Sequence, residues 1–163
     1  GETTAAVAAA HPHIDYLGIE VHTPGVGSLL KQIDALALGN VRIIQHDAVE
    51  VLQHMIAPAS LDGVHIFFPD PWPKKRHHKR RLLQPQTVAL IADRLRPGGV
   101  LHAATDHPGY AAQIAEVGDA EPRLRRISLD AERVPISVAR PVTKYERKAL
   151  AGTDVAELLW ERT

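Results

Sequence analysis

The residues best able to do chemistry lie in one stretch, where an aromatic run joins a basic one. The run FFPDPWP (residues 67–73) is followed at once by KKRHHKRR (residues 74–81), which holds six of the chain's 19 Lys and Arg residues. Prolines on both sides fix the backbone of Asp70, and Trp72 offers a flat apolar surface beside that carboxylate. Carboxylate, aromatic ring and cations together are what a site for an RNA base and its phosphates needs.

Simpler interpretations of both runs remain open at this point. The first run resembles in form the Asp/Asn-Pro-Pro-aromatic loops of enzymes that methylate exocyclic amines, but it could be a rigid turn with a core tryptophan. The net charge is zero, and outside residues 74–81 the chain carries 13 basic residues against 19 acidic ones. A basic patch on an acidic body favours a polyanionic partner and argues against general coating of nucleic acid. A solvated charged loop is the alternative, and charge alone does not decide between them.

Further acidic residues follow predicted strands. Glu20 closes an apolar stretch, Asp47 follows the next, and Asp106 follows a later one. An ionised carboxylate at the position of Glu20 can accept hydrogen bonds from both ribose hydroxyls of a nucleotide, a pattern shared by nicotinamide enzymes and methyltransferases. Asp47 fits an acceptor for the amino group of an adenine, with a helix N-cap as the alternative.

Hydrophobic periodicity predicts the elements that position these residues. Strands are expected at residues 15–21, 41–45, 63–68 and 100–104, with helices between them. This alternation predicts an α/β fold with a mostly parallel sheet, helices on both faces and ligands at the carboxyl ends of the strands. Residues 143–150 are expected to be helical, and residues 155–160 to form a late antiparallel edge strand.

Length and composition limit the class of protein. A chain of 163 residues suits a single domain, and the absence of cysteine excludes disulfides, thiolate metal sites and cysteine nucleophiles. No apolar run approaches the ~20 residues of a membrane span. We therefore expect a cytoplasmic protein with no membrane partner.

Six runs, in order along essentially the whole chain, resemble those of the bacterial tRNA (guanine-N7-)-methyltransferases. They are GIEVHTPGVG (residues 18–27), HDAVEVL (46–52), FFPDPWPKKRHHKRR (67–81), ATDHPGYA (104–111), RPVTKYE (140–146) and LLWER (158–162). The resemblance implies a Rossmann-like class I methyltransferase, with S-adenosyl-L-methionine as cofactor and tRNA as partner. We also expect no metal, and either a monomer or a homodimer.

The same resemblance assigns roles to individual residues. It implies cofactor contacts at Glu20, Asp47 and Asp70, with Asp70 also catalytic. It implies substrate binding by Lys74, Asp106, Thr143, Lys144, Tyr145 and Glu146. It implies RNA contacts by Arg76, His77, His78, Lys79, Arg80 and Arg81.

The family's pattern begins upstream of this chain's first residues. Family members open with a strand that ends in glutamate and a glycine-rich turn, whereas residues 1–4 here (GETT) resemble the end of that turn. We therefore expect residues 1–163 to form a single methyltransferase domain that is truncated at its N-terminus and binds cofactor weakly or is inactive.

The expected reaction is in-line transfer of a sulfonium methyl group to guanine N7. N7 carries an in-plane lone pair and no proton, so no general base is required, and positioning can supply ~7–11 kcal/mol of the barrier. One alternative is a noncatalytic RNA-binding module on the same fold. A nicotinamide-dependent oxidoreductase that uses Glu20 to bind ribose is a second alternative, but it leaves residues 67–81 unexplained. A metal hydrolase is disfavoured because this sequence has no helical pair of histidines at i, i+4 with a glutamate.

Overall fold

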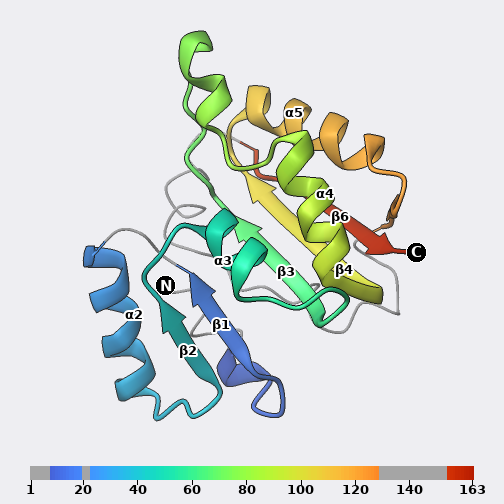
Figure 1. Cartoon of the computed structure of the whole chain (residues 1–163). Helices are drawn as coiled ribbons and strands as arrows, with labels where there is room; N and C mark the ends of the chain where they lie inside the picture. The colour runs from blue at the N-terminus through green and yellow to red at the C-terminus, as the bar shows by residue number, and fades with distance from the viewer. Residues whose placement is uncertain (1–7, 20–22, 129–153) are drawn as a thin grey trace. The chain divides into compact units, whose positions relative to one another are not determined.

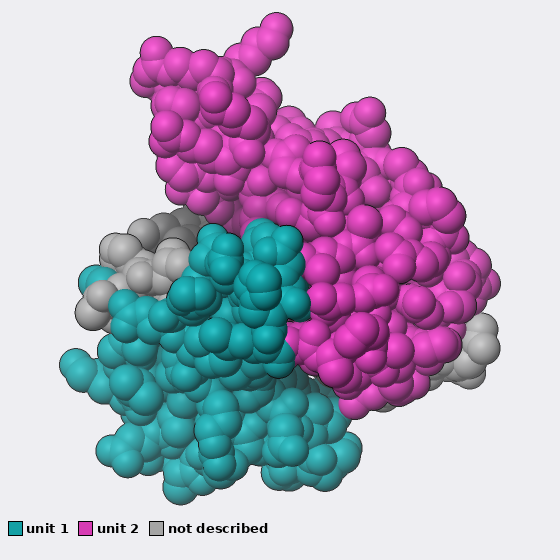
Figure 2. All heavy atoms as spheres, in the orientation of Figure 1, with its two compact units in different colours: residues 1–55, 139–144 teal, residues 56–138, 145–163 magenta. Residues whose placement is uncertain are grey.

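The computed structural model describes residues 8–19, 23–128 and 154–163. Contacts divide the chain into two compact units, coloured separately in Figure 2: residues 1–55 with 139–144, and residues 56–138 with 145–163. Each unit has its own hydrogen-bonded sheet among the described residues. The expectation of one domain over residues 1–163 stays a prediction.

The first unit pairs two short parallel strands (Figure 1). Strand β1 (Tyr16–Ile19) and strand β2 (Val41–Ile44) run in register, and helix α2 (Thr23–Ala35) connects them. Helix α3 (Ala48–His54) follows β2. A parallel pair needs such a crossover connection, so the predicted strand–helix–strand order is confirmed here.

The second unit contains a four-stranded sheet in the order β3-β4-β6-β5. Strands β3 (Leu61–Phe67) and β4 (Leu95–Thr105) are parallel, whereas β6 (Ala156–Arg162) runs antiparallel to both β4 and β5 (Leu124–Arg126). The α/β class and the late antiparallel strand are thus confirmed. The outermost strand beside β6 is β5, which is three residues long and too short to leave a periodic signal in the sequence.

Strand β4 begins earlier than predicted. The sequence predicted a strand from Val100, but Leu95 already pairs with Leu61 of β3. A register shift between Leu61 and Gly63 absorbs the extra residues, as a β-bulge does. Gly98, within this early part of β4, adopts a φ of +87°, in the region that favours glycine.

Two helices pack against this sheet. Helix α4 (Pro85–Arg94) has proline in its first turn, where it is well tolerated, and buries Val88, Ile91 and Ala92. Helix α5 (Pro108–Ala120) buries Tyr110, Ile114 and Gly118. Both helices contact β4, and Figure 1 shows them beside each other over the sheet.

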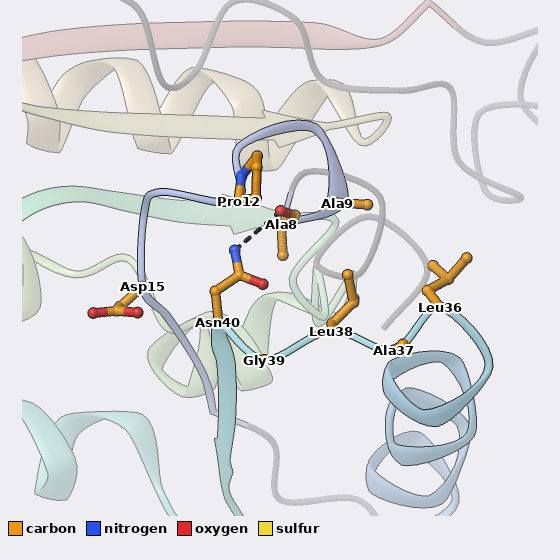
Figure 3. A pocket seen from close by; sticks show the side chains of 9 residues that line it. All are labelled: Ala8, Ala9, Pro12, Asp15, Leu36, Ala37, Leu38, Gly39 and Asn40. Atoms are coloured by element: carbon orange, nitrogen blue, oxygen red, sulfur yellow. Dashed lines mark hydrogen bonds between the residues drawn. The ribbon is translucent and has the colours of Figure 1, made fainter.

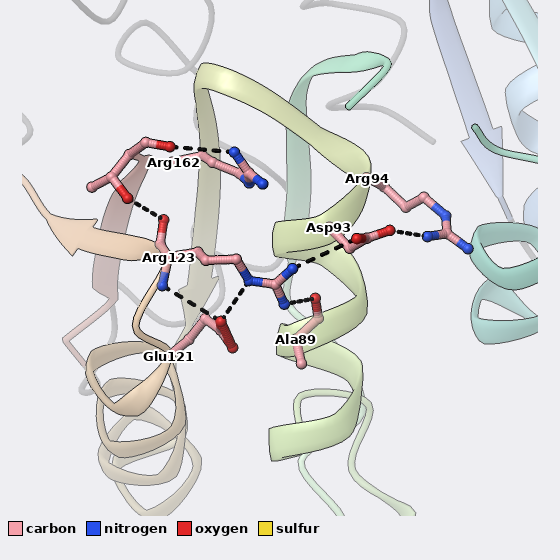
Figure 4. A network of polar contacts seen from close by, with 7 residues as sticks. Ala89, Asp93, Arg94, Glu121, Arg123 and Arg162 are labelled. Atoms are coloured by element: carbon pink, nitrogen blue, oxygen red, sulfur yellow. Dashed lines mark hydrogen bonds and ion pairs between the residues drawn. The ribbon is translucent and has the colours of Figure 1, made fainter. Parts of the chain in front are cut away.

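Arg123 ties the end of α5 to α4 (Figure 4). Its Nε donates to Oε1 of Glu121 at 2.9 Å, and its Nη2 donates to the carbonyl oxygen of Ala89 at 2.8 Å. Nη1 lies 3.6 Å from Oδ1 of Asp93 on α4. These contacts join α4, which precedes β4 in the sequence, to the end of α5, which follows it.

Candidate active site at the carboxyl ends of β3 and β4

Two predicted site residues follow neighbouring parallel strands of the second unit. Asp70 comes three residues after the end of β3, and Asp106 directly follows β4. Phe67 pairs with Ala104, and the Phe68 amide donates to the Ala104 carbonyl at 2.8 Å, so the two loops leave the same edge of the sheet. This is the edge at which open parallel sheets bind ligands.

The turn around Asp70 is held in an unusual backbone conformation. Phe68 and Trp72, which bracket it, have φ values of +53° and +42°, although neither is glycine. Such a conformation costs on the order of 1–3 kcal/mol per residue and persists only where its surroundings impose it. Oδ1 of Asp70 accepts a hydrogen bond from the Trp72 amide at 3.0 Å, and Asp70 itself is exposed. The turn therefore presents a fixed carboxylate to solvent.

The basic run folds over Trp72. Residues Lys75–Arg80 form a 3-10 helix, and the Cζ atom of Arg80 lies 5.1 Å from the centroid of the Trp72 ring, a cation–π distance. The His77 ring meets the same indole edge-on at 5.7 Å. Nε2 of His78 lies 3.2 Å from the Pro73 carbonyl oxygen. The structure thus brings the predicted aromatic and cationic groups together within one short segment.

The RNA-contacting candidates differ in exposure. Those with exposed side chains are Arg76, Lys79 and Arg80, together with the substrate candidate Lys74; His77 and His78 are half-buried. Arg81 is only 4% exposed, and its guanidinium is bonded within the protein. Burial distinguishes Arg81 from its neighbours in the run, and the RNA contact expected of it stays a prediction.

Asp106 lines a cavity of about 300 Å³ beyond the end of β4. The other lining residues are Thr105, His107, Pro108, Ala111, Asp154, Val155 and Ala156. His107 is the N-cap of α5, and its Nδ1 accepts a hydrogen bond from the Tyr110 amide at 3.0 Å, which fixes the ring beside the cavity. Two carboxylates and several small apolar groups suit a ligand with hydrogen-bond donors on one edge and a flat body. Neither Asp154 nor His107 was predicted, since no strand-end pattern marked them.

Asp47 lies in the first unit and caps α3. Its side chain accepts a hydrogen bond from the Glu50 amide at 3.1 Å, which confirms the N-cap interpretation. The cofactor contact expected of the same carboxylate stays a prediction. Five other predicted site residues lie outside the described residues: Glu20, Thr143, Lys144, Tyr145 and Glu146.

A second cavity, of about 440 Å³, lies in the first unit (Figure 3). It is lined by residues around the starts of β1 and β2, including Ala8, Pro12, Asp15 and Leu38. The Asn40 amide there is engaged with backbone, donating to the Ala8 carbonyl at 3.0 Å and the Ile14 carbonyl at 2.8 Å. The cavity adjoins the amino ends of parallel strands, away from the edge where such sheets bind ligands.

Histidines of the second unit make ring contacts and hydrogen bonds. The rings of His65 and His102 meet edge to face with centroids 6.0 Å apart, and His102 Nε2 lies 2.9 Å from Oε1 of Glu157.

Within residues 8–19, 23–128 and 154–163, no group of three or more histidine or acidic side chains is placed to hold a metal ion. No helix in the described part of the chain is long and apolar enough to cross a membrane.

Comparison with known proteins identifies the family. A family model described as a putative methyltransferase matches residues 1–158. The chain belongs to this methyltransferase family. A curated relative from Mycolicibacterium gilvum is 66% identical over 168 residues, covering 100% of this chain and 64% of the relative. One from Mycobacterium tuberculosis (strain ATCC 25177 / H37Ra) is 62% identical over 165 residues, covering 99% of this chain and 63% of the relative.

Both of these relatives are described as tRNA (guanine-N(7)-)-methyltransferases. The chain spans less than two thirds of the length of each, and 54% of the length of a similarly described relative from Mycobacterium sp. (strain KMS). Each of these relatives therefore contains sequence beyond the part that this chain matches.

Solved structures share the fold at low sequence identity. An rRNA methylase from Streptococcus thermophilus has a TM-score of 0.57 at 16% identity, covering 91% of this chain and 73% of its own. A putative methyltransferase from Streptococcus mutans, in complex with SAH, has a TM-score of 0.56 at 13% identity, covering 91% and 76%. The [4+2]-cyclase SpnF has a TM-score of 0.61 at 14% identity, covering 97% and 69%. These likenesses confirm the class I methyltransferase fold, and the cyclase shows that the fold alone does not define the reaction.

Proposed function

We propose that the protein containing this chain transfers a methyl group from S-adenosylmethionine to N7 of a guanine in tRNA. The observation that carries the proposal is the fixed, exposed Asp70 carboxylate at the end of β3, beside the Trp72 indole and the Arg80 cation. The activity named for relatives 62–66% identical to the chain supports the same reaction. A tRNA substrate would place the reaction in the cytoplasm.

The residues present suit the proposed cofactor. Asp47 and Asp70 are exposed carboxylates that follow β2 and β3, and each offers acceptor oxygens suited to an adenine amino group or a cationic centre. When bound, S-adenosylmethionine supplies the electrophilic methyl group. The protein's part is to hold the base so that N7, whose lone pair needs no deprotonation, points along the line of transfer. The ring of Trp72 offers a stacking surface, and Arg80 a positive charge for the backbone.

The remaining site residues are assigned by resemblance and position. Asp106, in the 300 Å³ cavity, would accept hydrogen bonds from donor groups of the guanine, and the exposed Lys74 would meet its phosphate. Glu20 is assigned to the cofactor's ribose. Substrate binding is also assigned to Thr143, Lys144, Tyr145 and Glu146.

The experiment is single-turnover methylation of bulk tRNA by the full-length protein, with mapping of the product nucleotide. Asp70→Ala should slow methyl transfer at least about tenfold, equivalent to ~1.4 kcal/mol of transition-state stabilisation, because the oriented carboxylate is lost. A matched control is Asp62→Ala, which removes an exposed aspartate from the opposite end of β3, where it pairs with Arg96. That control should keep the parent rate.

Two results would contradict the proposal. Transfer at the parent rate by a folded Asp70→Ala protein would remove Asp70 from the mechanism. Tight tRNA binding by the parent with no uptake of S-adenosylmethionine in isothermal titration would instead support a noncatalytic RNA-binding module.

A further inference from the structure

The geometry points to Arg81 as a positioning residue, which holds the Asp70 turn against α5 while its neighbours in the basic run remain available to RNA. The role in methyl transfer rests on the proposed function, whereas the role in holding the turn does not. Arg81 is 4% exposed, in contrast to the exposed Lys79 and Arg80 that precede it.

The guanidinium of Arg81 bridges two segments far apart in sequence. Its Nε donates to the Pro71 carbonyl at 2.6 Å, and its Nη1 donates to Oε1 of Gln113 on α5 at 2.7 Å. Its Cζ lies 4.9 Å from the centroid of the Tyr110 ring. A planar fork with separate donors can hold both acceptors at once, which the single ammonium group of lysine cannot do in the same geometry.

The α5 end of this bridge is itself anchored. Gln113 donates from Nε2 to the Leu83 carbonyl at 3.0 Å, and the Leu83 amide donates to the Tyr110 hydroxyl at 3.0 Å. Tyr110 and Gln113 are three residues apart, so they project from the same face of α5. Leu83 and Tyr110 are fully buried. Arg81 therefore connects the turn to a fixed part of the fold.

The other end of the bridge is the residue between Asp70 and Trp72. Proline has no amide hydrogen, so the carbonyl is the backbone group through which Pro71 can be held. The turn needs such support, because Phe68 and Trp72 both adopt positive φ values. A hydrogen bond from a charged donor in a buried setting is among the stronger single interactions available.

The hydroxyl of Tyr110 lies within electrostatic range of both Arg81 and Asp70. Burial raises the pKa of Tyr110, the cation of Arg81 opposes that rise, and the carboxylate of Asp70 adds to it. The hydroxyl of Tyr110 thus senses both the guanidinium and the carboxylate.

The first test measures the turn directly, with no need for activity. Trp72 donates its amide hydrogen to Asp70, so exchange of that hydrogen with deuterium reports whether the turn is intact. In the full-length protein, Arg81→Lys and Gln113→Ala should each speed exchange at Trp72 by about tenfold or more, while the Leu101 amide in β4 exchanges as in the parent. Gln113→Ala keeps the test available should Arg81→Lys fail to fold.

The second test separates positioning from phosphate contact. If Arg81 positions the turn, Arg81→Lys and Gln113→Ala should each slow single-turnover methylation about tenfold with the salt dependence of tRNA binding unchanged. The double variant should be little slower than either single variant, because both remove the same bridge. The control is Arg125→Lys, which alters an arginine paired with Glu161 on the sheet and should change neither measurement.

Two outcomes would overturn the inference. Parent-like exchange at Trp72 in both variants would show that Arg81 does not hold the turn. Arg81→Gln lowering the salt slope of tRNA binding by ~0.7–0.9, the value for one lost phosphate contact, would show that Arg81 meets RNA. Failure of the parent to methylate tRNA would count against the proposed function alone, since the exchange experiment still decides the role of Arg81.

Discussion

Replacing Gly118 with alanine should destabilise the protein, although glycine is usually unfavourable inside a helix. Gly118 lies where α5 meets β6, and a Cβ atom there would fall 2.2 Å from Cζ2 of Trp160 and 2.5 Å from Cε2. Carbon atoms in ordinary contact are roughly 3.5–4.0 Å apart, so the indole would have to move by about 1 Å or more. The ring is fully buried, donates from Nε1 to Oδ1 of Asp119 at 3.0 Å and lies under Arg126, with Cζ at 5.1 Å.

The size of the effect follows from opposing contributions. Overpacking a close-packed core costs typically ~1–3 kcal/mol. Movement of the indole also weakens its hydrogen bond to the Asp119 carboxylate, whereas alanine improves helix propensity over glycine by about 1 kcal/mol. We expect the free energy of unfolding to fall by roughly 1–3 kcal/mol, which lowers Tm by about 2–12 °C for a protein of this size.

Urea and thermal unfolding of the full-length protein, followed by tryptophan fluorescence and circular dichroism, measure this difference. The control is Gly27→Ala in α2, where a Cβ atom meets no heavy atom within 4 Å. That change should raise stability by ~0.5–1 kcal/mol through helix propensity. A Gly118→Ala protein as stable as the parent, or more stable, would refute the packing argument.

Two further predictions concern charge. Lys79→Ala with Arg80→Ala should weaken binding to all tRNA sequences alike and reduce the salt slope by up to ~0.7–0.9 per lost phosphate contact; identical slopes for parent and variant would mark these residues as solvated surface. Burial by itself raises the pKa of Asp119, but hydrogen bonds from Trp160 and Arg126 lower it below its usual 3.8. The stabilisation from Asp119 should therefore be complete above about pH 4 and disappear as pH falls through the folded pKa, because the unfolded state takes up the proton first. Urea unfolding from pH 2 to 6 should show that the parent has a higher free energy of unfolding than Asp119→Asn near pH 6 and that this difference shrinks in acid. A difference that does not change with pH would contradict this.

Local patterns in the sequence were sufficient for most of the regular structure. The apolar run at residues 63–68 predicted β3, and Asp47 as an N-cap predicted the start of α3; both are confirmed. Each signal acts within a few residues of itself, through capping or burial. The same local character explains why the residue types around Asp70 and in the adjacent basic run were enough to predict a site there.

Two features that depend on distant partners were not predicted. Strand β5 exists because residues 124–126 pair with β6, more than 30 residues later in the chain. Strand β4 begins at Leu95 because Leu61 pairs with it across a bulge. Such pairing leaves no periodic trace in a segment of three or four residues.

The contrast is clearest in the pair Arg80 and Arg81. By sequence alone the two are adjacent members of one basic run, and this determined that the segment carries positive charge beside Trp72. Only the tertiary structure separates them, because the acceptor Gln113 lies 32 residues beyond Arg81 and reaches it through the packing of α5. Residue type determines which charges and donors a segment contains, but long-range packing determines which of them are buried and which remain free to meet a substrate.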